Sequence, residues 1–80
     1  MYVIERTYIT NSAANGEIVT YLDDYGKYTV TVSIHGQKSL YPKMFPLEAT
    51  ARAYAKWVSE NWRDHVRAVN YIKTTPLTCK

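Results

Sequence analysis

The pattern of apolar and polar positions divides the chain into three extended segments followed by an amphipathic helix. Residues 2–10 and 17–22 are rich in β-branched and aromatic side chains, which favours strands. In residues 28–35 apolar and polar side chains alternate, so one face of a third strand is expected in the core and the other in solvent. Polar clusters at 11–16 and 23–26 predict the connecting turns, and Asn15-Gly16 is a pair that accepts the positive φ angles of a tight hairpin.

The second half of the chain predicts one helix and leaves a final segment open. Residues 38–44 could form a short fourth extended segment or an irregular loop, since Pro42 would be tolerated only at a sheet edge, and we choose the loop. Residues 47–62 then carry an apolar stripe at helical spacing over about four turns. Between Arg67 and Lys73 the residue types favour a strand, although the apolar positions would also fit a continued helix, and we choose the strand.

These elements predict an α+β domain. Its sheet is a three-stranded antiparallel meander, with the C-terminal segment as a fourth strand, packed on one amphipathic helix. One sheet face and the apolar side of the helix enclose the expected core, which comprises Tyr28, Val30, Val32, Ile34, Leu47, Ala51, Tyr54, Val58 and Trp62.

Length and composition indicate a single domain over residues 1–80. Eighty residues suffice for one modest core, and 46% apolar with 21% charged residues is typical of a globular chain and not of a disordered one. No apolar run approaches the roughly 18 residues of a membrane span. The N-terminal segment, interrupted by Glu5 and Arg6, lacks the layout of a signal peptide, and the lone Cys79 agrees with a reducing compartment. We therefore expect a cytoplasmic protein.

The net charge of +3 is unevenly distributed along the chain. Residues 1–26 contain one basic and four acidic side chains, whereas residues 27–80 contain nine basic and three acidic ones. Such a basic segment favours an acidic partner, either nucleic acid or an acidic protein surface. It is equally what a solvated, solubilising surface requires, so charge alone does not identify a partner.

The sequence contains no combination of residues that predicts catalysis, a cofactor or a metal site. His35 and His65 fall in unrelated elements, and Asp23 with Asp24 is better explained by hydrogen bonding to backbone amides within a turn than by a cation site. Ser33 and His35 share a strand face but lack a third group that would orient the imidazole. No glycine-rich phosphate loop is present either. We expect no enzyme, no cofactor and no small-molecule substrate.

Tyrosine is the residue type in excess, with eight in the chain beside two tryptophans. A core of this size cannot enclose all of them, so some should be exposed, either around the rim of the core or as binding anchors. Tyr25 and Tyr41 fall in predicted loops with lysines a few residues away, the arrangement of an aromatic hot spot with a polar rim. The predicted partner-binding residues are Tyr25, Lys27, Lys38, Tyr41 and Lys43.

Residues 25–57 contain Tyr25-Gly26-Lys27-Tyr28, a predicted strand, Phe45, and a helical segment from Glu48 to Tyr54 with the sequence Ala-Arg-Ala-Tyr. In these features the stretch resembles the Apetala-type DNA-binding domain. The resemblance implies a three-stranded sheet on a helix, with the outer sheet face in the DNA major groove. That family presents several Arg and Trp side chains to the bases, whereas the predicted outer face here offers Thr29, Thr31, Ser33 and His35, which cannot make the bidentate contacts to guanine.

In size and architecture the chain also resembles phage-encoded accessory proteins, including anti-CRISPR proteins. This resemblance implies a non-enzymatic inhibitor that occupies a binding site on a host protein or ribonucleoprotein complex. It accounts for exposed tyrosines, a basic bias and the absence of catalytic chemistry, so it is our first expectation. A small sheet-type DNA-binding domain is the alternative, with nucleic acid as its partner.

Overall fold

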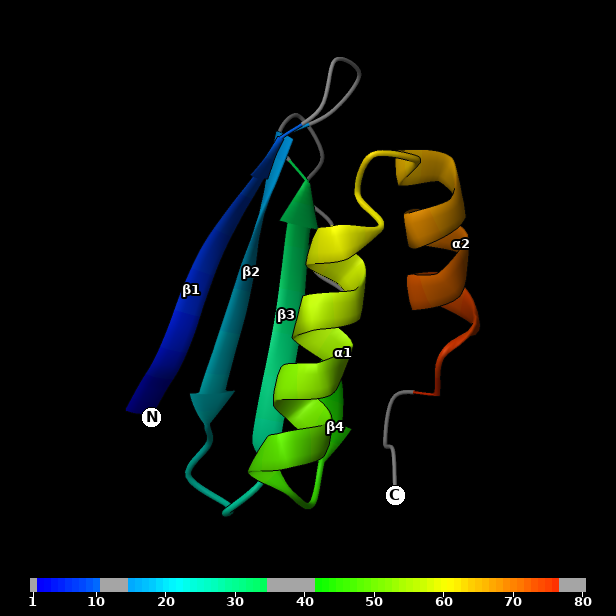
Figure 1. Ribbon diagram of the computed structural model, residues 1–80. Coiled ribbons are helices and arrows are strands. Elements are labelled where there is room, and N and C mark those ends of the chain that lie inside the picture. Colours follow the sequence, from blue (N-terminus) through cyan, green and yellow to red (C-terminus); the bar gives the residue numbers. More distant parts are fainter. Residues whose placement is uncertain (1, 11–14, 35–41, 77–80) are drawn as a thin grey trace.

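A computed structural model of the chain describes residues 2–10, 15–34 and 42–76. An antiparallel sheet is followed by two helices, and α1 lies against one face of the sheet with α2 beside it (Figure 1). The sheet has the order β1-β2-β3-β4, which confirms the predicted α+β meander. The elements are β1 (Tyr2–Thr10), β2 (Asn15–Leu22), β3 (Tyr28–Ile34), β4 (Lys43–Phe45), α1 (Glu48–Glu60) and α2 (His65–Thr74).

Strand pairing sorts the sheet side chains into an inner face toward α1 and an outer face away from it. On the inner face Ile18 lies opposite Val32 and Thr20 opposite Val30, and all four are buried. The next inner row contains Gly16 opposite Ile34, with Ile9 of β1 completing it. Alternation along each strand, as predicted for β3, therefore places the apolar set under α1.

The predicted core is largely confirmed. Val30, Val32, Ile34, Ala51, Tyr54, Val58 and Trp62 are buried, and Tyr28 is partly buried against them. Leu47 was wrongly placed there: it precedes the first turn of α1 in an extended conformation and is 61% exposed. The buried cluster also contains residues outside the predicted core list, namely Ile9, Ile18, Phe45, Ala55, Ala68 and Ile72.

Two boundaries differ from the prediction because pairing extends further than the residue types suggested. Asn15 and Gly16 belong to β2, opposite Thr10 and Ile9, so they are not the turn. Gly16 is needed there for space: a Cβ at this position would come within 2.7 Å of the carbonyl oxygen of Ser33. The predicted loop ends earlier than expected, since Lys43–Phe45 forms β4 at the sheet edge, directly after Pro42.

The segment predicted as a C-terminal strand is the helix α2, so that prediction is wrong. Asp64 caps its start, where the carboxylate accepts a hydrogen bond from the backbone N–H of Arg67 at 3.2 Å. Ala68 and Ile72, four residues apart and both fully buried, form its packed side. A capped helix with two such contacts outweighs the β propensity of the residue types in this segment, because tertiary packing overrides propensity.

Candidate functional site

The turn between β2 and β3 is organised by the side chain of Asp23. Its Oδ1 accepts hydrogen bonds from the backbone N–H groups of Tyr25 and Lys27, each at 2.9 Å, and Gly26 takes a φ of +81°. This confirms the prediction that Asp23 serves local backbone bonding. Among the described residues no group of three His, Cys, Asp or Glu side chains could hold a metal ion.

These bonds stabilise the charged form of Asp23. The hydrogen bond from the backbone N–H of Lys27 has the largest effect and lowers the pKa of the Asp23 carboxyl. Burial opposes it, and the bonds from Tyr25 and Thr29 lower the pKa further. The turn is therefore held most firmly when Asp23 is ionised. Its conformation presents Tyr25 at the tip, where the side chain is 91% exposed.

Of the predicted partner-binding residues, the structure brings Tyr25 and Lys27 together on this turn, and both are exposed. Lys38 and Tyr41 lie outside the described residues. The expectation that Lys43 offers a mobile cation at the surface is wrong, because its side chain belongs to the inner face and is only 7% exposed.

Lys43 has a structural role. Its Nζ donates a hydrogen bond to the carbonyl oxygen of Thr75 at 2.8 Å, which joins β4 to the residue that ends α2. A buried ammonium group needs such a partner, and Thr75 supplies it. No feature of the sequence near residue 43 points to this contact, since it joins positions 32 residues apart.

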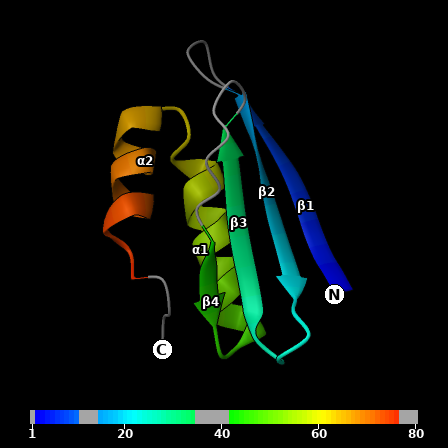
Figure 2. The ribbon, with the colours of Figure 1, turned by 180° about the vertical axis from the view of Figure 1, so that it is seen from behind.

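Among the described residues no helix lies on the outer sheet face, since α1 and α2 both lie on the other side (Figure 2). Two rows of side chains cross it. One row contains Arg6, Val19 and Thr31, and the other contains Tyr8, Glu17 and Ser33. A third row contains Val3, Tyr21, Thr29 and Met44. Apart from Thr29, which is buried, these are the side chains that a partner would meet on this side of the molecule.

The charges on the outer sheet face compensate each other. Nη1 of Arg6 lies 3.3 Å from Oε1 of Glu17, and these are the charged members of the rows described above. Thr29 was expected to be exposed but is buried at the end of the face, where its hydroxyl donates to Oδ2 of Asp23 at 3.4 Å. His35 lies outside the described residues. The hydrogen bond from Thr29 to Asp23 joins the Asp23 turn, and hence Tyr25, to the end of the outer face.

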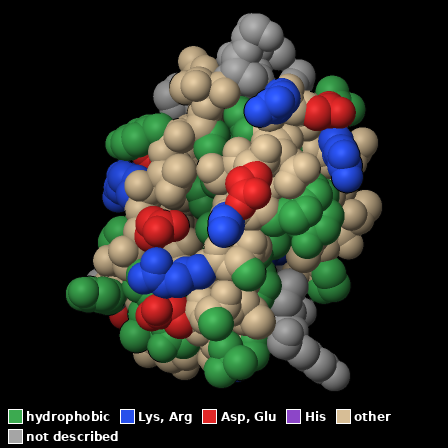
Figure 3. Space-filling model, viewed as in Figure 1, with side chains coloured by type: hydrophobic (Ala, Val, Ile, Leu, Met, Phe, Trp, Pro, Cys, Tyr) green, Lys and Arg blue, Asp and Glu red, His purple; other side chains and the backbone are tan. Residues whose placement is uncertain are grey.

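The helical side of the molecule differs from the outer face in charge and shape. Lys and Arg side chains alternate there with Asp and Glu side chains (Figure 3). Arg52 bonds to both Glu48 and Glu5, at 3.1 and 3.4 Å. An apolar area lies between α1 and α2, where the ring of Trp57 packs on that of Tyr71 with centroids 3.9 Å apart. Phe45 and Tyr54 extend this aromatic cluster.

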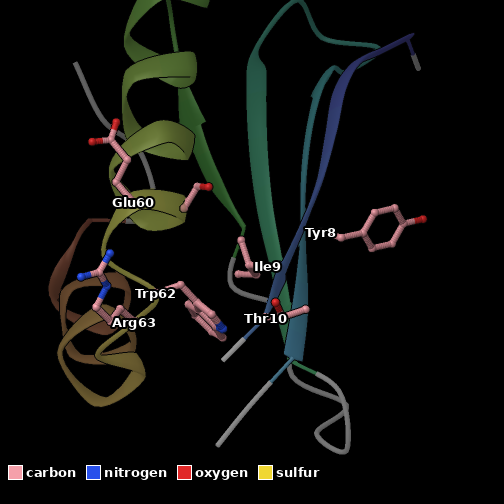
Figure 4. Close-up of a pocket in the computed structure, with 7 residues that line it drawn as sticks. Tyr8, Ile9, Thr10, Glu60, Trp62 and Arg63 are labelled. Atoms are coloured by element: carbon pink, nitrogen blue, oxygen red, sulfur yellow. The ribbon is translucent and has the colours of Figure 1, made fainter. Parts of the chain in front are cut away.

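A pocket of about 350 Å³ opens between the end of β1 and the end of α1. In Figure 4 Trp62 lies toward Ile9 and Thr10, whereas Tyr8 points away to the other side of the strand. Glu60 and Arg63 lie at its rim, and Glu60 is 3.8 Å from Nζ of Lys56. The pocket offers room for a side chain.

Sequence reasoning missed the aromatic residues of the outer sheet face. Tyr8 is 67% exposed there, and Tyr21 is half-buried in the neighbouring strand. The alternation of residues 2–10 contains the signal, since Arg6 and Tyr8 are two positions apart and Ile9 is on the opposite face. That alternation can be read only after the register of β1 is known, because the bulge between Val3 and Glu5 interrupts it.

Fold and site together describe a small α+β domain in which the described helices cover one sheet face and leave the other without a helix. No family model, no curated protein and no solved structure matches the chain. In the part of the chain that the structure describes, neither helix has the length and apolar character needed to cross a membrane.

Proposed function

We propose that the chain is a non-enzymatic binding protein that blocks a host protein or ribonucleoprotein complex by occupying a site on it. The observation that carries this proposal is the outer sheet face, on which no described helix packs, with Tyr8 and Tyr21 on it and Tyr25 at the turn joined to its end. Tyrosine provides a large contact area at a low cost in side-chain entropy and is enriched in binding hot spots. An inhibitor of the phage or mobile-element type would act in this way.

The charge of the outer face favours a protein surface as the partner over duplex DNA. Readout of bases by a sheet requires free arginines or other donors in the major groove. Arg6 is the arginine of the described outer face, and its guanidinium is engaged by Glu17. The face is close to neutral, with aromatic and small polar side chains, which is the composition of a protein–protein interface.

Affinity capture with the tagged chain tests the proposal. Lysate of a candidate host is treated with nuclease, and a partner should remain bound. Tyr25→Ala should then weaken binding about 30-fold, the equivalent of about 2 kcal/mol for loss of an anchor. Val66→Ala is the matched control, because Val66 is also exposed but lies on α2. It should leave the affinity unchanged.

The alternative, a sheet-type DNA-binding domain, makes the opposite predictions. Affinity for duplex DNA would fall steeply between low and physiological salt, because several counterions are released on binding. Binding to a protein through tyrosines depends weakly on salt, and loss of Lys27 should then change the association rate more than the final affinity. Capture that disappears with nuclease, together with a steep salt dependence, would overturn the proposed function.

A further inference from the structure

The two edges of the sheet are unequal. β4 has three residues, follows Pro42 directly, and its Lys43 is bonded to Thr75, so it offers little backbone to another strand. β1 has nine residues, and among the described residues it pairs with β2 alone. A long strand with one free edge is a template for pairing with another chain.

The two halves of β1 differ in their readiness for such pairing. The bulge between Val3 and Glu5 interrupts the first half, and Glu5 places a charge on the inner face, where Oε2 lies 3.4 Å from Nη1 of Arg52. Bulges and inward charges are devices that prevent edge pairing. Residues 6–10 contain neither, pair regularly with β2, and include Thr7, Tyr8 and Ile9, which are strong strand formers.

We infer that two copies of the chain associate through residues 6–10 of β1, antiparallel, to form one continuous eight-stranded sheet. A symmetric dimer of this kind has a two-fold axis perpendicular to the sheet, so both copies present the same face on the same side. Two residues that lie opposite each other across the new strand pair must therefore belong to the same face of the sheet. The axis must therefore pass through a residue that faces its own copy, and the candidates are Arg6, Thr7 and Tyr8.

Charge and strand geometry select Tyr8 among these three. An axis at Arg6 would place two guanidinium groups opposite each other, which is unfavourable. An axis at Thr7 would place Glu5 opposite Ile9 and draw the bulge into the pairing. An axis at Tyr8 avoids the facing guanidinium groups and keeps Glu5 and the bulge out of the pairing. It places Tyr8 opposite Tyr8 and Arg6 opposite Thr10 on the outer face, and Thr7 opposite Ile9 on the inner face.

This arrangement also accounts for the exposure of Tyr8. Its ring is 67% exposed in the single chain and points away from the pocket beside it (Figure 4). In the dimer it would meet the same ring of the second copy, and aromatic cross-strand pairs are among the stabilising ones. On the inner face, Thr7 of the second copy would lie beside Ile9 at the rim of that pocket.

Sedimentation or light scattering at increasing concentration tests the dimer. The apparent mass should rise toward twice the 9.3 kDa of the chain, with dissociation on dilution because five residues per strand make a small interface. Tyr8→Lys should abolish the increase by placing like charges at the axis, and Tyr8→Phe should retain it. Tyr25→Lys is the control, and should associate as the parent does. A parent chain that stays monomeric at millimolar concentration overturns the inference.

Cysteine crosslinking tests the register. In a Cys79→Ser background, Arg6→Cys, Thr7→Cys and Tyr8→Cys are each oxidised mildly. Only Tyr8→Cys should give the disulfide-linked dimer, since only there do the two thiols face each other within reach of a disulfide. Fastest linkage from either other position would overturn the Tyr8 axis. The inference does not rest on the proposed function: Tyr8→Lys removes self-association, whereas failure of partner capture by Tyr25 variants would affect the proposed function alone.

Discussion

Replacement of Ile72 by alanine is the most direct test of how α2 contributes to this fold. Ile72 is fully buried, and with Ala68 it forms the packed side of the helix. The substitution removes three carbon atoms, at about 0.8 kcal/mol each, and leaves a cavity that adds to the loss, so about 3 kcal/mol is expected. A chain of 80 residues has a total stability of about 4–12 kcal/mol, of which this is a large part.

Urea denaturation followed by circular dichroism measures this loss, and the melting temperature should fall by roughly 15 °C. Asn70→Ala is the matched control. In a strand over residues 67–73, Asn70 would share a face with Ala68 and Ile72, whereas in α2 it is exposed. If this segment packs as a helix, Ile72→Ala should lower the free energy of unfolding strongly, whereas Asn70→Ala should change it by no more than about 0.5 kcal/mol. Comparable losses at both positions, or none at Ile72, would refute the reasoning.

Two further predictions concern polar groups in and beside the sheet. The hydroxyl of Thr20 is buried with no hydrogen-bond partner among the described residues. Thr20→Val should therefore raise the free energy of unfolding, measured by urea titration, by about 1 kcal/mol. A loss of stability would mean that the hydroxyl is bonded. The folded-state pKa of Asp23 is lowered, so its contribution to stability is complete above about pH 4 and is lost as the pH falls through the folded pKa. Melting curves between pH 5 and pH 2 should show a smaller acid-induced decrease for Asp23→Asn than for the parent, and equal decreases would contradict the assignment.

The parts of the fold that could be predicted from sequence are those fixed by local pattern. Alternation defined β3, helical spacing defined α1, and the apolar set of both elements is buried as expected apart from Leu47. The α2 segment could not be assigned by residue type, because Val66, Val69 and Ile72 favour a strand in isolation. The signal for a helix was present in Asp64, three residues before the N–H that it caps.

The candidate site was predictable only where it depends on a turn. Tyr25 and Lys27 could be placed at the surface because Asp23 and Gly26 mark a tight turn between two strands. The burial of Lys43 could not be predicted, since it depends on the register of β4 and on the position of Thr75. Tyr8 likewise required the pairing of β1 with β2, which a bulge offsets by one residue.

The structure also changes what the basic composition implies about a partner. On the helical side Arg52 is bonded to Glu48 and Glu5, and Lys56 lies near Glu60, so much of the positive charge counted in the sequence is compensated there. The cations that follow lie in the connection between α1 and α2 (Arg63) and in α2 (Arg67 and Lys73), on the side opposite the outer face. A nucleic acid attracted by that charge would approach α2, whereas a sheet-reading mode requires the near-neutral outer face. Charge and shape therefore point to opposite sides of the molecule, which is the reason to expect a protein surface, and not a phosphate backbone, against the outer sheet face.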